Sequence, residues 1–308
     1  MQIRQSDLEA YSRCAQQKRL YNLADAGMIP QPKNLSATVF GTVMHHALQS
    51  METLHAQGRE DAGTVAVQTF EHYWHPDNIG ALEPNGVEEW LPRQGYSQLL
   101  YRGRENLRQY YDLLKRDNDP LLALELSFNV PIVIDGVEHT LHGTLDRLAM
   151  RKHQRMTQPY LAIEDFKSGK KGTYLRHRTQ WTMYSFASLH PAFWQPFVEA
   201  GTLDGILEPL HKRKFSLFDG DGGNYLVIPR RGKWINLHES TVKLHDVGWR
   251  LTQDYRRLTV ALREYIRACE AGIYPLSISG DNCTYCPFRD GICGGEPVPD
   301  ESEVPTWH

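Results

Sequence analysis

The spacing of hydrophobic residues along this chain changes near residue 121. Before it, apolar residues recur three and four positions apart, which places them on one side of an α-helix. The sequence Ser6-Asp7-Leu8-Glu9 matches a capping box, which would begin the first of these helices at Ser6. The spacing predicts helices over 6–24, 40–55 and 96–115, with further helical structure in 60–118 around a loop at 76–95.

After residue 121 the alternation has a period of two, which is typical of β-strands. It predicts strands over 122–133 and 137–150, joined by a hairpin turn at Asp135-Gly136, and a third strand over 160–167. Further along we expect a helix at 175–190, weaker strands at 203–211 and 224–229, and a long helix over 238–271. Helices before and after a run of strands favour the α/β class, with a mixed central sheet flanked by helices.

The composition is that of an ordinary globular protein, with 41% hydrophobic and 23% charged residues among 308. A chain of this length forms one large domain or two modest ones. The net charge of −3 provides no bulk attraction for nucleic acid, so a polyanion would have to contact local basic segments. No apolar stretch of about 18 residues predicts a membrane span. The first residues lack an apolar signal region, so we expect a cytoplasmic protein.

Charged residues interrupt two of the predicted strands where a buried strand normally has none. The first segment, LHGTLDRL at 141–148, contains Asp146, and the second, LAIEDFKSGKK at 161–171, contains Asp165 and Lys167. Residues two apart on a strand point to the same face, so Asp165 and Lys167 share a face while Glu164 points to the other. Carboxylates are ligands for Mg²⁺, and a lysine beside them can stabilise charge on a phosphate. An Asp–Lys pair at the end of a strand is also a common structural feature.

Two helical segments add candidate residues. Gly41-Thr42-Val43-Met44-His45 opens a helix and offers His45 as a metal ligand, although a polar helix histidine is the simpler interpretation. Gln180 and Tyr184 are four positions apart on one helix face. They suit either the binding of a phosphate or base, or ordinary packing at a half-buried interface.

Five motifs in order resemble the RecB-like branch of the PD-(D/E)XK nuclease superfamily. They are Gly41…His45, the acidic Glu125 on the first strand, Gly143…Asp146-Arg147, Asp165-Phe166-Lys167 and Gln180…Tyr184. The resemblance spans 41–184, and the cysteines extend it to 14–293. It implies a restriction-endonuclease-like mixed sheet with a helical insertion, and cleavage of DNA that depends on Mg²⁺ or Mn²⁺.

The resemblance also implies roles for individual residues. His45, Asp146, Asp165 and the backbone carbonyl of Phe166 would be metal ligands, and Lys167 would be the catalytic lysine beside Asp165 and Asp146. Gln180 and Tyr184 would hold DNA near the site. Glu164 would lie outside the metal shell.

The cysteines indicate a second metal site. Cys283, Cys286 and Cys293 lie within eleven residues, which in a reducing compartment favours metal ligation over disulfides. Four thiolates hold either zinc or an iron–sulfur cluster, and both remain open from the spacing. The pattern around Cys269 predicts a buried free thiol that packs inside a helix. The resemblance to AddB-type and CRISPR-associated nucleases implies that Cys14 is the fourth ligand of a [4Fe–4S] cluster, within a module formed by both chain ends. Those relatives typically have C-x2-C-x5-C, whereas this chain has six residues in the second interval.

Basic residues crowd the segment after Lys167, and they are the expected contacts to DNA phosphates. These contacts would be independent of base sequence. The residues are Lys170, Lys171, Arg176 and Arg178. Trp181 and Trp234 suit either stacking on single-stranded bases or core packing. No phosphate-binding loop of the G-x-x-x-x-G-K-[ST] type is present, so we do not expect a helicase or ATPase.

We therefore expect one nuclease domain over 1–295. Its parts are an N-terminal helix with a cluster cysteine (1–37), a helical segment with the histidine motif (38–120), a catalytic core (121–235) and a long helix with the other cysteines (236–295), before a flexible tail (296–308). The predicted function is an exonuclease acting on DNA with free ends in recombination, repair or replication. Expected partners are a helicase, a recombinase or a single-strand-binding protein, and an oligomer is compatible with the sequence. The alternatives are a non-catalytic DNA-binding or scaffold subunit and a structure-specific endonuclease.

Overall fold

The structure is a computed structural model of the whole chain. It describes residues 1–91, 94–117, 119–151, 160–167, 178–199, 231–237, 242–246, 252–276, 286–288 and 293. The chain divides into two compact units. Unit 1 contains Met1–Lys33, Asn129–Gly143 and Leu251–His308, and unit 2 contains Asn34–Phe128 and Thr144–Arg250. Among the described helices, none is long and apolar enough to cross a membrane.

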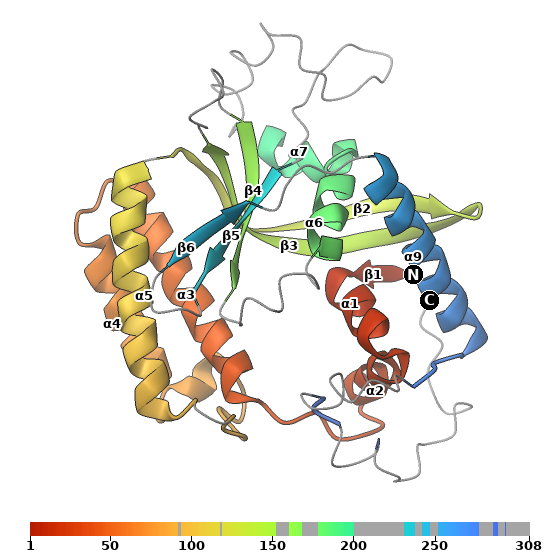
Figure 1. Cartoon of the computed structure of the whole chain (residues 1–308), viewed down its shortest axis with the longest axis horizontal. Helices are drawn as coiled ribbons and strands as arrows, with labels where there is room; N and C mark the ends of the chain where they lie inside the picture. The colour runs from red at the N-terminus through yellow and green to blue at the C-terminus, as the bar shows by residue number, and fades with distance from the viewer. Residues whose placement is uncertain are drawn as a thin grey trace, which may run out of the picture. The chain divides into compact units, whose positions relative to one another are not determined.

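Three helices of unit 2 pack together, as Figure 1 shows, and they share a core rich in aromatic residues. They are α3 (Ser36–Ala56), α4 (Ala62–Trp74) and α5 (Tyr96–Asp117). The ring of Phe40 meets Phe70 and Trp74 edge to face, at centroid distances of 5.9 and 5.7 Å. A Cβ atom at Gly103 of α5 would come within 2.1 Å of the Phe70 ring, so this glycine allows α5 to approach α4 closely. This group of helices carries His45 at the middle of α3.

The rest of unit 2 contains strands of a mixed sheet. These strands are β2 (Leu121–Ile134), β3 (Val137–Arg151), β4 (Tyr160–Lys167), β5 (Arg231–Asn236) and β6 (Lys243–Asp246). Residues Asn129–Gly143 of β2 and β3 belong to unit 1. Strand β4 lies between β3, to which it is antiparallel, and β5, to which it is parallel. Strand β6 pairs antiparallel with β5, and β2 pairs with β3. The predicted α/β class with a mixed sheet flanked by helices is confirmed.

The two faces of β4 are covered by different helices. Phe166 is buried in the same core as Val43 of α3, and its ring meets Tyr110 of α5 at 5.4 Å. Helix α6 (Arg178–Ala187) covers the other face, where its Gln180 contacts Asp165. Side chains that alternate along β4 therefore reach two chemically different environments.

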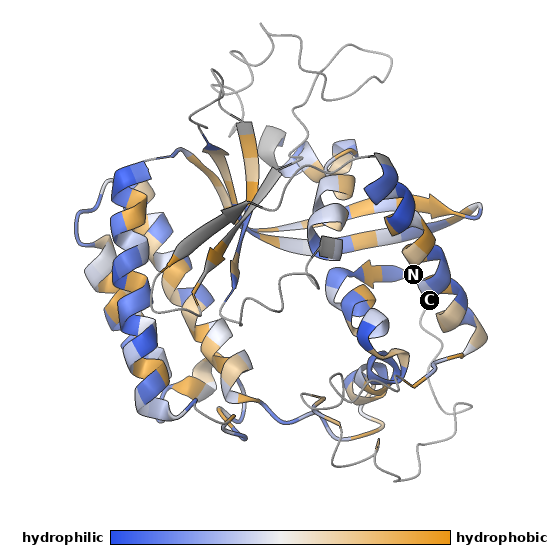
Figure 2. Ribbon diagram, viewed as in Figure 1, coloured by the Kyte–Doolittle hydropathy of each residue, from blue (hydrophilic) through white to orange (hydrophobic). Residues whose placement is uncertain are grey.

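Unit 1 combines both ends of the chain with the tip of the β2–β3 hairpin. Its elements are β1 (Gln2–Arg4), α1 (Gln5–Arg13), α2 (Ala15–Asp25) and α9 (Thr252–Ala271). Strand β1 runs parallel to β3 at Thr140–His142. Tyr11 of α1 meets Tyr265 of α9 at 5.4 Å. Helix α9 is amphipathic in Figure 2, and it buries Leu258, Leu262 and Tyr265 on one side.

The hairpin turn was predicted correctly, because its cause is local. Asp135 and Gly136 both adopt positive φ, 51° and 84°, which a two-residue hairpin turn requires. Arg263 and Arg267 of α9 bind the Asp135 carboxylate at 2.8 and 3.0 Å within unit 1.

Other predicted elements differ from the structure. The predicted helix over 6–24 is broken at Cys14, whose backbone is extended. The helix cap also differs: the sequence predicted it at Ser6, but in the structure it is at Arg4, whose backbone N–H donates to the Asp7 carboxylate. Strand β1 leads directly into α1 and thereby shifts the cap. The predicted helix over 238–271 is wrong in its first part, because 243–246 pairs with β5 as a strand. The predicted strands at 203–211 and 224–229, residues 175–177 and the tail at 296–308 lie outside the described residues.

Candidate active site

Three potential metal ligands meet in unit 2: His45 of α3, Glu125 of β2 and Asp146 of β3. One ligand atom of each lies within 4.8 Å of the others. His45 Nδ1 is 3.7 Å from Glu125 Oε1 and 3.8 Å from Asp146 Oδ2. Within the part of the chain that the structure describes, this is the one group of three or more His, Cys, Asp or Glu side chains spaced to hold a metal ion. Its members are only partly buried, so an ion can reach them.

Glu125 has an unusual backbone conformation. Its φ angle is 46°, in the left-handed region that a non-glycine residue rarely adopts, and it lies inside a strand. Buried and exposed residues alternate regularly along β2 only after this position. Such strain costs about 1–3 kcal/mol and persists where the surrounding structure holds it, often at functional sites. The conformation accompanies the approach of the Glu125 carboxylate to His45.

The backbone of Phe166 links β4 to the three-ligand group. Its N–H donates to Asp146 Oδ2 at 2.7 Å, and its carbonyl oxygen is 3.2 Å from His45 Nε2. Burial opposes a positive charge on His45, but Asp146 and Glu125 outweigh this effect and raise the pKa of His45 to about 9. In the absence of a metal ion, a protonated imidazole would offset part of the negative charge of the two carboxylates.

Asp165 and Lys167 form an ion pair on one face of β4, with 2.6 Å between Lys167 Nζ and Asp165 Oδ2. Gln180 Nε2 donates to the other carboxylate oxygen at 2.8 Å. Asp165 is fully buried, and burial raises its pKa, an effect that Lys167 opposes and Asp146 reinforces. The ligand set expected from the resemblance included Asp165. In the structure, Glu125 lies beside His45 and Asp146, and the Asp165 carboxylate contacts Lys167 and Gln180; a role of Asp165 as a metal ligand stays a prediction.

Gln180 and Tyr184 of α6 lie in the interior. Gln180 Nε2 also donates to the Tyr184 hydroxyl at 3.0 Å, and this hydroxyl donates to the Thr144 carbonyl oxygen of β3 at 2.9 Å. Both side chains are at most 5% exposed, and burial raises the pKa of Tyr184, so its hydroxyl stays protonated. The pair contacts Asp165 and β3, and a role of the two residues in holding DNA stays a prediction. Trp181 is buried as well, in agreement with its interpretation as a core residue.

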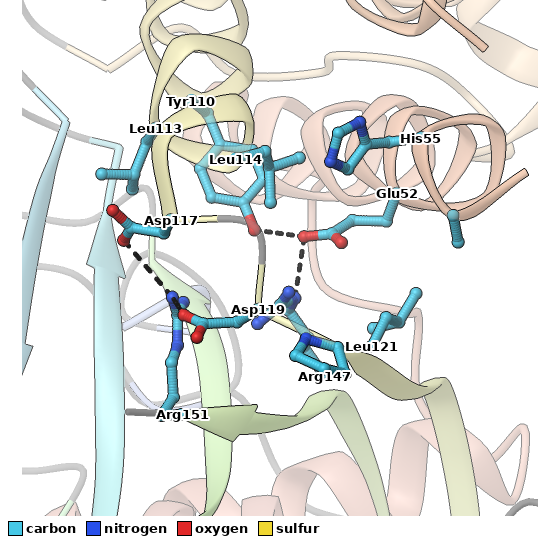
Figure 3. Close-up of a pocket in the computed structure, with 12 residues that line it drawn as sticks. Glu52, His55, Tyr110, Leu113, Leu114, Asp117, Asp119, Leu121, Arg147 and Arg151 are labelled. Atoms are coloured by element: carbon cyan, nitrogen blue, oxygen red, sulfur yellow. Dashed lines mark hydrogen bonds and ion pairs between the residues drawn. The ribbon is translucent and has the colours of Figure 1, made fainter. Parts of the chain in front are cut away.

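The opposite face of β4 carries a second set of charges. Glu164 binds Arg147 and Arg151 there, away from the three-ligand group, as the alternation of side chains along the strand predicted. Glu52 of α3 completes the set through an ion pair with Arg147. Glu52, Arg147 and Arg151 line a cavity of about 400 Å³ (Figure 3). No sequence pattern had indicated Glu52, because its partner is nearly a hundred positions away.

The predicted basic and cysteine residues are described only in part. Lys170, Lys171, Arg176 and Cys283 lie outside the described residues, and for Arg178 only the backbone, at the start of α6, is described. Cys14 separates α1 from α2, Cys286 packs against the buried side chains of α2, and Cys293 is exposed. Among the described residues these cysteines form no second group with metal-ligand spacing. Cys269 is half-buried and hydrogen bonded to Tyr265 and Tyr274, and burial raises the pKa of its thiol.

Comparison with known proteins identifies the family of this chain. No curated protein matches the chain. A solved structure described as "Crystal structure of SSO0001" matches over 91% of this chain and 94% of its own, with a TM-score of 0.34 and 10% identity. A family model described as the PD-(D/E)XK nuclease superfamily matches residues 2–294. With nearly the whole chain matched and an acidic group with a histidine and a neighbouring lysine in place, the chain belongs to the PD-(D/E)XK nuclease superfamily.

Proposed function

We propose that this chain is a divalent-metal-dependent deoxyribonuclease of the RecB-like branch, which hydrolyses phosphodiester bonds from the ends of DNA. The observation that carries the proposal is the convergence of His45, Glu125 and Asp146 beside the Asp165–Lys167 pair. Membership of a nuclease superfamily implies a nucleic-acid substrate.

The donor atoms fit Mg²⁺ or Mn²⁺. Carboxylate and carbonyl oxygens suit these ions, and the group offers Glu125, Asp146 and the nearby carbonyl of Phe166, together with the His45 imidazole. Asp165 stays in the proposed ligand set because its carboxyl interacts electrostatically with Asp146 and His45. A divalent cation bound there would polarise the phosphate and lower the pKa of a water molecule.

Lys167 supplies a fixed positive charge beside this site. Its side chain is 23% exposed and thus reachable by a phosphate, while Asp165 Oδ2 holds its ammonium group at 2.6 Å. A cation held in place stabilises the negative charge that develops on the phosphate during hydrolysis. Gln180 and Tyr184 hold Asp165 and β3 in position, and Lys170, Lys171, Arg176 and Arg178 are the proposed contacts to the DNA backbone.

We also propose a [4Fe–4S] cluster held by Cys14, Cys283, Cys286 and Cys293, with zinc as the alternative. Supporting it, Phe288 follows Cys286 closely and packs against Leu20 and Tyr21 of α2, the helix that Cys14 precedes. The segment that carries Cys286 thus belongs to the same packed unit as α2. Anaerobic purification with an absorbance spectrum and iron and zinc assays tests the cluster. A colourless protein loaded with zinc contradicts it.

Digestion of end-labelled linear DNA and covalently closed circular DNA tests the nuclease proposal. With Mg²⁺ or Mn²⁺ we expect linear single- or double-stranded DNA to be shortened from its ends and closed circles to stay intact. Asp146→Asn, which removes one carboxylate charge, is the inactive control. Cleavage of closed circles would instead indicate the endonuclease alternative. DNA binding without any cleavage would indicate a non-catalytic subunit.

A further inference from the structure

Buried ion pairs connect α3, β3 and β4 in unit 2, and Figure 3 shows the one between Glu52 and Arg147. We call Glu52, Tyr110, Arg147, Arg151 and Glu164 the buried ion network. Arg147 Nε is 2.8 Å from Glu52 Oε1, and another nitrogen of the same guanidinium binds Glu164. Arg151 binds both oxygens of Glu164, at 2.6 and 2.8 Å, and Tyr110 donates to Glu52. The side chains of Glu52, Arg147 and Glu164 are at most 1% exposed.

The buried ion network and the candidate active site, which includes Asp165 and Phe166, share three elements: α3, β3 and β4. On β3, Arg147 follows Asp146 directly, and on β4, Glu164 precedes Asp165. On α3, Glu52 and His45 are about two helical turns apart, which places them on the same side of the helix. Glu52, Arg147 and Glu164 thus each lie on the same element as a residue of the candidate active site.

The network also marks the register between β3 and β4. Arg147 and Glu164 are direct cross-strand partners in this antiparallel ladder. A slip of one residue would turn every side chain of a strand to the opposite face, which would bury Asp146 or Asp165 in the wrong layer. The ion pair opposes such a slip, because the slip would leave the charges of Arg147 and Glu164 buried without partners.

We propose that Arg147 is a positioning residue for the metal site: through Glu52 and Glu164 it docks α3 onto β3 and β4, so that His45 meets Asp146 and the Phe166 carbonyl. This inference rests on the proposed metal-dependent function. Buried ion pairs add little net stability compared with well-packed apolar residues, but they demand a defined geometry. That requirement is what a site needs when its ligands come from three separate elements.

A double variant, Glu52→Gln/Arg147→Met, tests the proposal. It removes one negative and one positive charge, so Glu164 keeps its partner Arg151, and the glutamine still accepts the hydrogen bond of Tyr110. Mn²⁺ binding is measured on the full chain by electron paramagnetic resonance titration, without DNA, together with the thermal melting temperature. We expect the half-saturating Mn²⁺ concentration to rise about tenfold or more, as for other supporting residues of metal sites, with little change in melting.

Leu107→Ala is the matched control. Leu107 is fully buried in α5 and belongs to the apolar core next to the network. This change should lower the melting temperature and leave the affinity for Mn²⁺ unchanged. Arg147→Lys retains a charge but cannot bridge two carboxylates with one planar group, so it should weaken Mn²⁺ binding to an intermediate degree.

The outcomes separate the two proposals. Equal Mn²⁺ affinity in the wild type and the double variant overturns the positioning role of Arg147. An equal loss of affinity in Leu107→Ala also overturns it, because general destabilisation would then explain the effect. Mn²⁺ binding by a wild-type protein that does not cleave DNA contradicts only the nuclease proposal, because the titration contains no DNA.

Discussion

Oε1 of Glu125 lies 3.7 Å from Nδ1 of His45, so a strained strand residue and a helix residue direct their side chains to one point. At this distance the two side chains are too far apart for a direct hydrogen bond. Together with Asp146 they form a group in which a divalent cation can replace the imidazole proton. The left-handed backbone of Glu125 is the structural feature that separates this carboxylate from an ordinary strand glutamate.

Substitution of Glu125 should separate metal binding from stability. Glu125→Gly removes the carboxylate and also relieves the left-handed backbone strain, whereas Glu125→Ala removes the carboxylate and keeps the strain. We expect both variants to lose at least tenfold in Mn²⁺ affinity. The glycine variant should have a free energy of unfolding about 1 kcal/mol higher than the alanine variant, measured by urea denaturation. Equal unfolding energies would mean that the backbone at 125 is not strained.

The sequence predicted those features whose causes are local. The hairpin at Asp135-Gly136 and the bounds of β4 follow from turn residues and alternation over a few positions. Strand β6 was missed because its four residues become a strand only by pairing with β5. The partners of the site residues were hidden for the same reason. Motif order indicated His45 and Asp146, but the contacts of Glu125 and Glu52 depend on how α3 packs on the sheet.

His45 should make the metal-free protein less stable as the pH rises. The pKa of His45 is raised from 6.5 to about 9 in the folded protein, so the folded state binds this proton more tightly than the unfolded state. The stabilisation is complete below about 6.5 and is lost as the pH rises toward 9. Urea unfolding across this range with a chelator present measures the effect.

His45→Gln is the control for this pH dependence. It should flatten the decline in unfolding free energy between pH 6.5 and 9, because the titrating group is gone. An unchanged slope in the variant would show that another group is responsible.

Lys167→Met should impair catalysis more than metal binding. The ammonium group is paired with Asp165 and is not a member of the three-ligand group. Loss of one charge that stabilises the transition state typically lowers kcat by a factor of about 10²–10³. We expect that loss in single-turnover DNA cleavage, with Mn²⁺ affinity within about threefold of wild type. Lys167→Arg keeps the charge and should recover part of the rate, whereas an active methionine variant would exclude Lys167 from catalysis.

Tyr184→Phe distinguishes a role in positioning from contact with DNA. The change removes the hydroxyl that binds the Thr144 carbonyl and receives the Gln180 amide, while the ring keeps its packing against Phe128. A buried carbonyl without a donor costs about 1–3 kcal/mol, so the unfolding free energy should fall by about this amount. Gln180 loses the Tyr184 hydroxyl as a partner, and Gln180 in turn holds the Asp165 carboxylate. We therefore expect kcat to fall while KM for DNA stays constant. A raised KM with unchanged kcat would instead show that Tyr184 binds DNA directly, as the family resemblance implies.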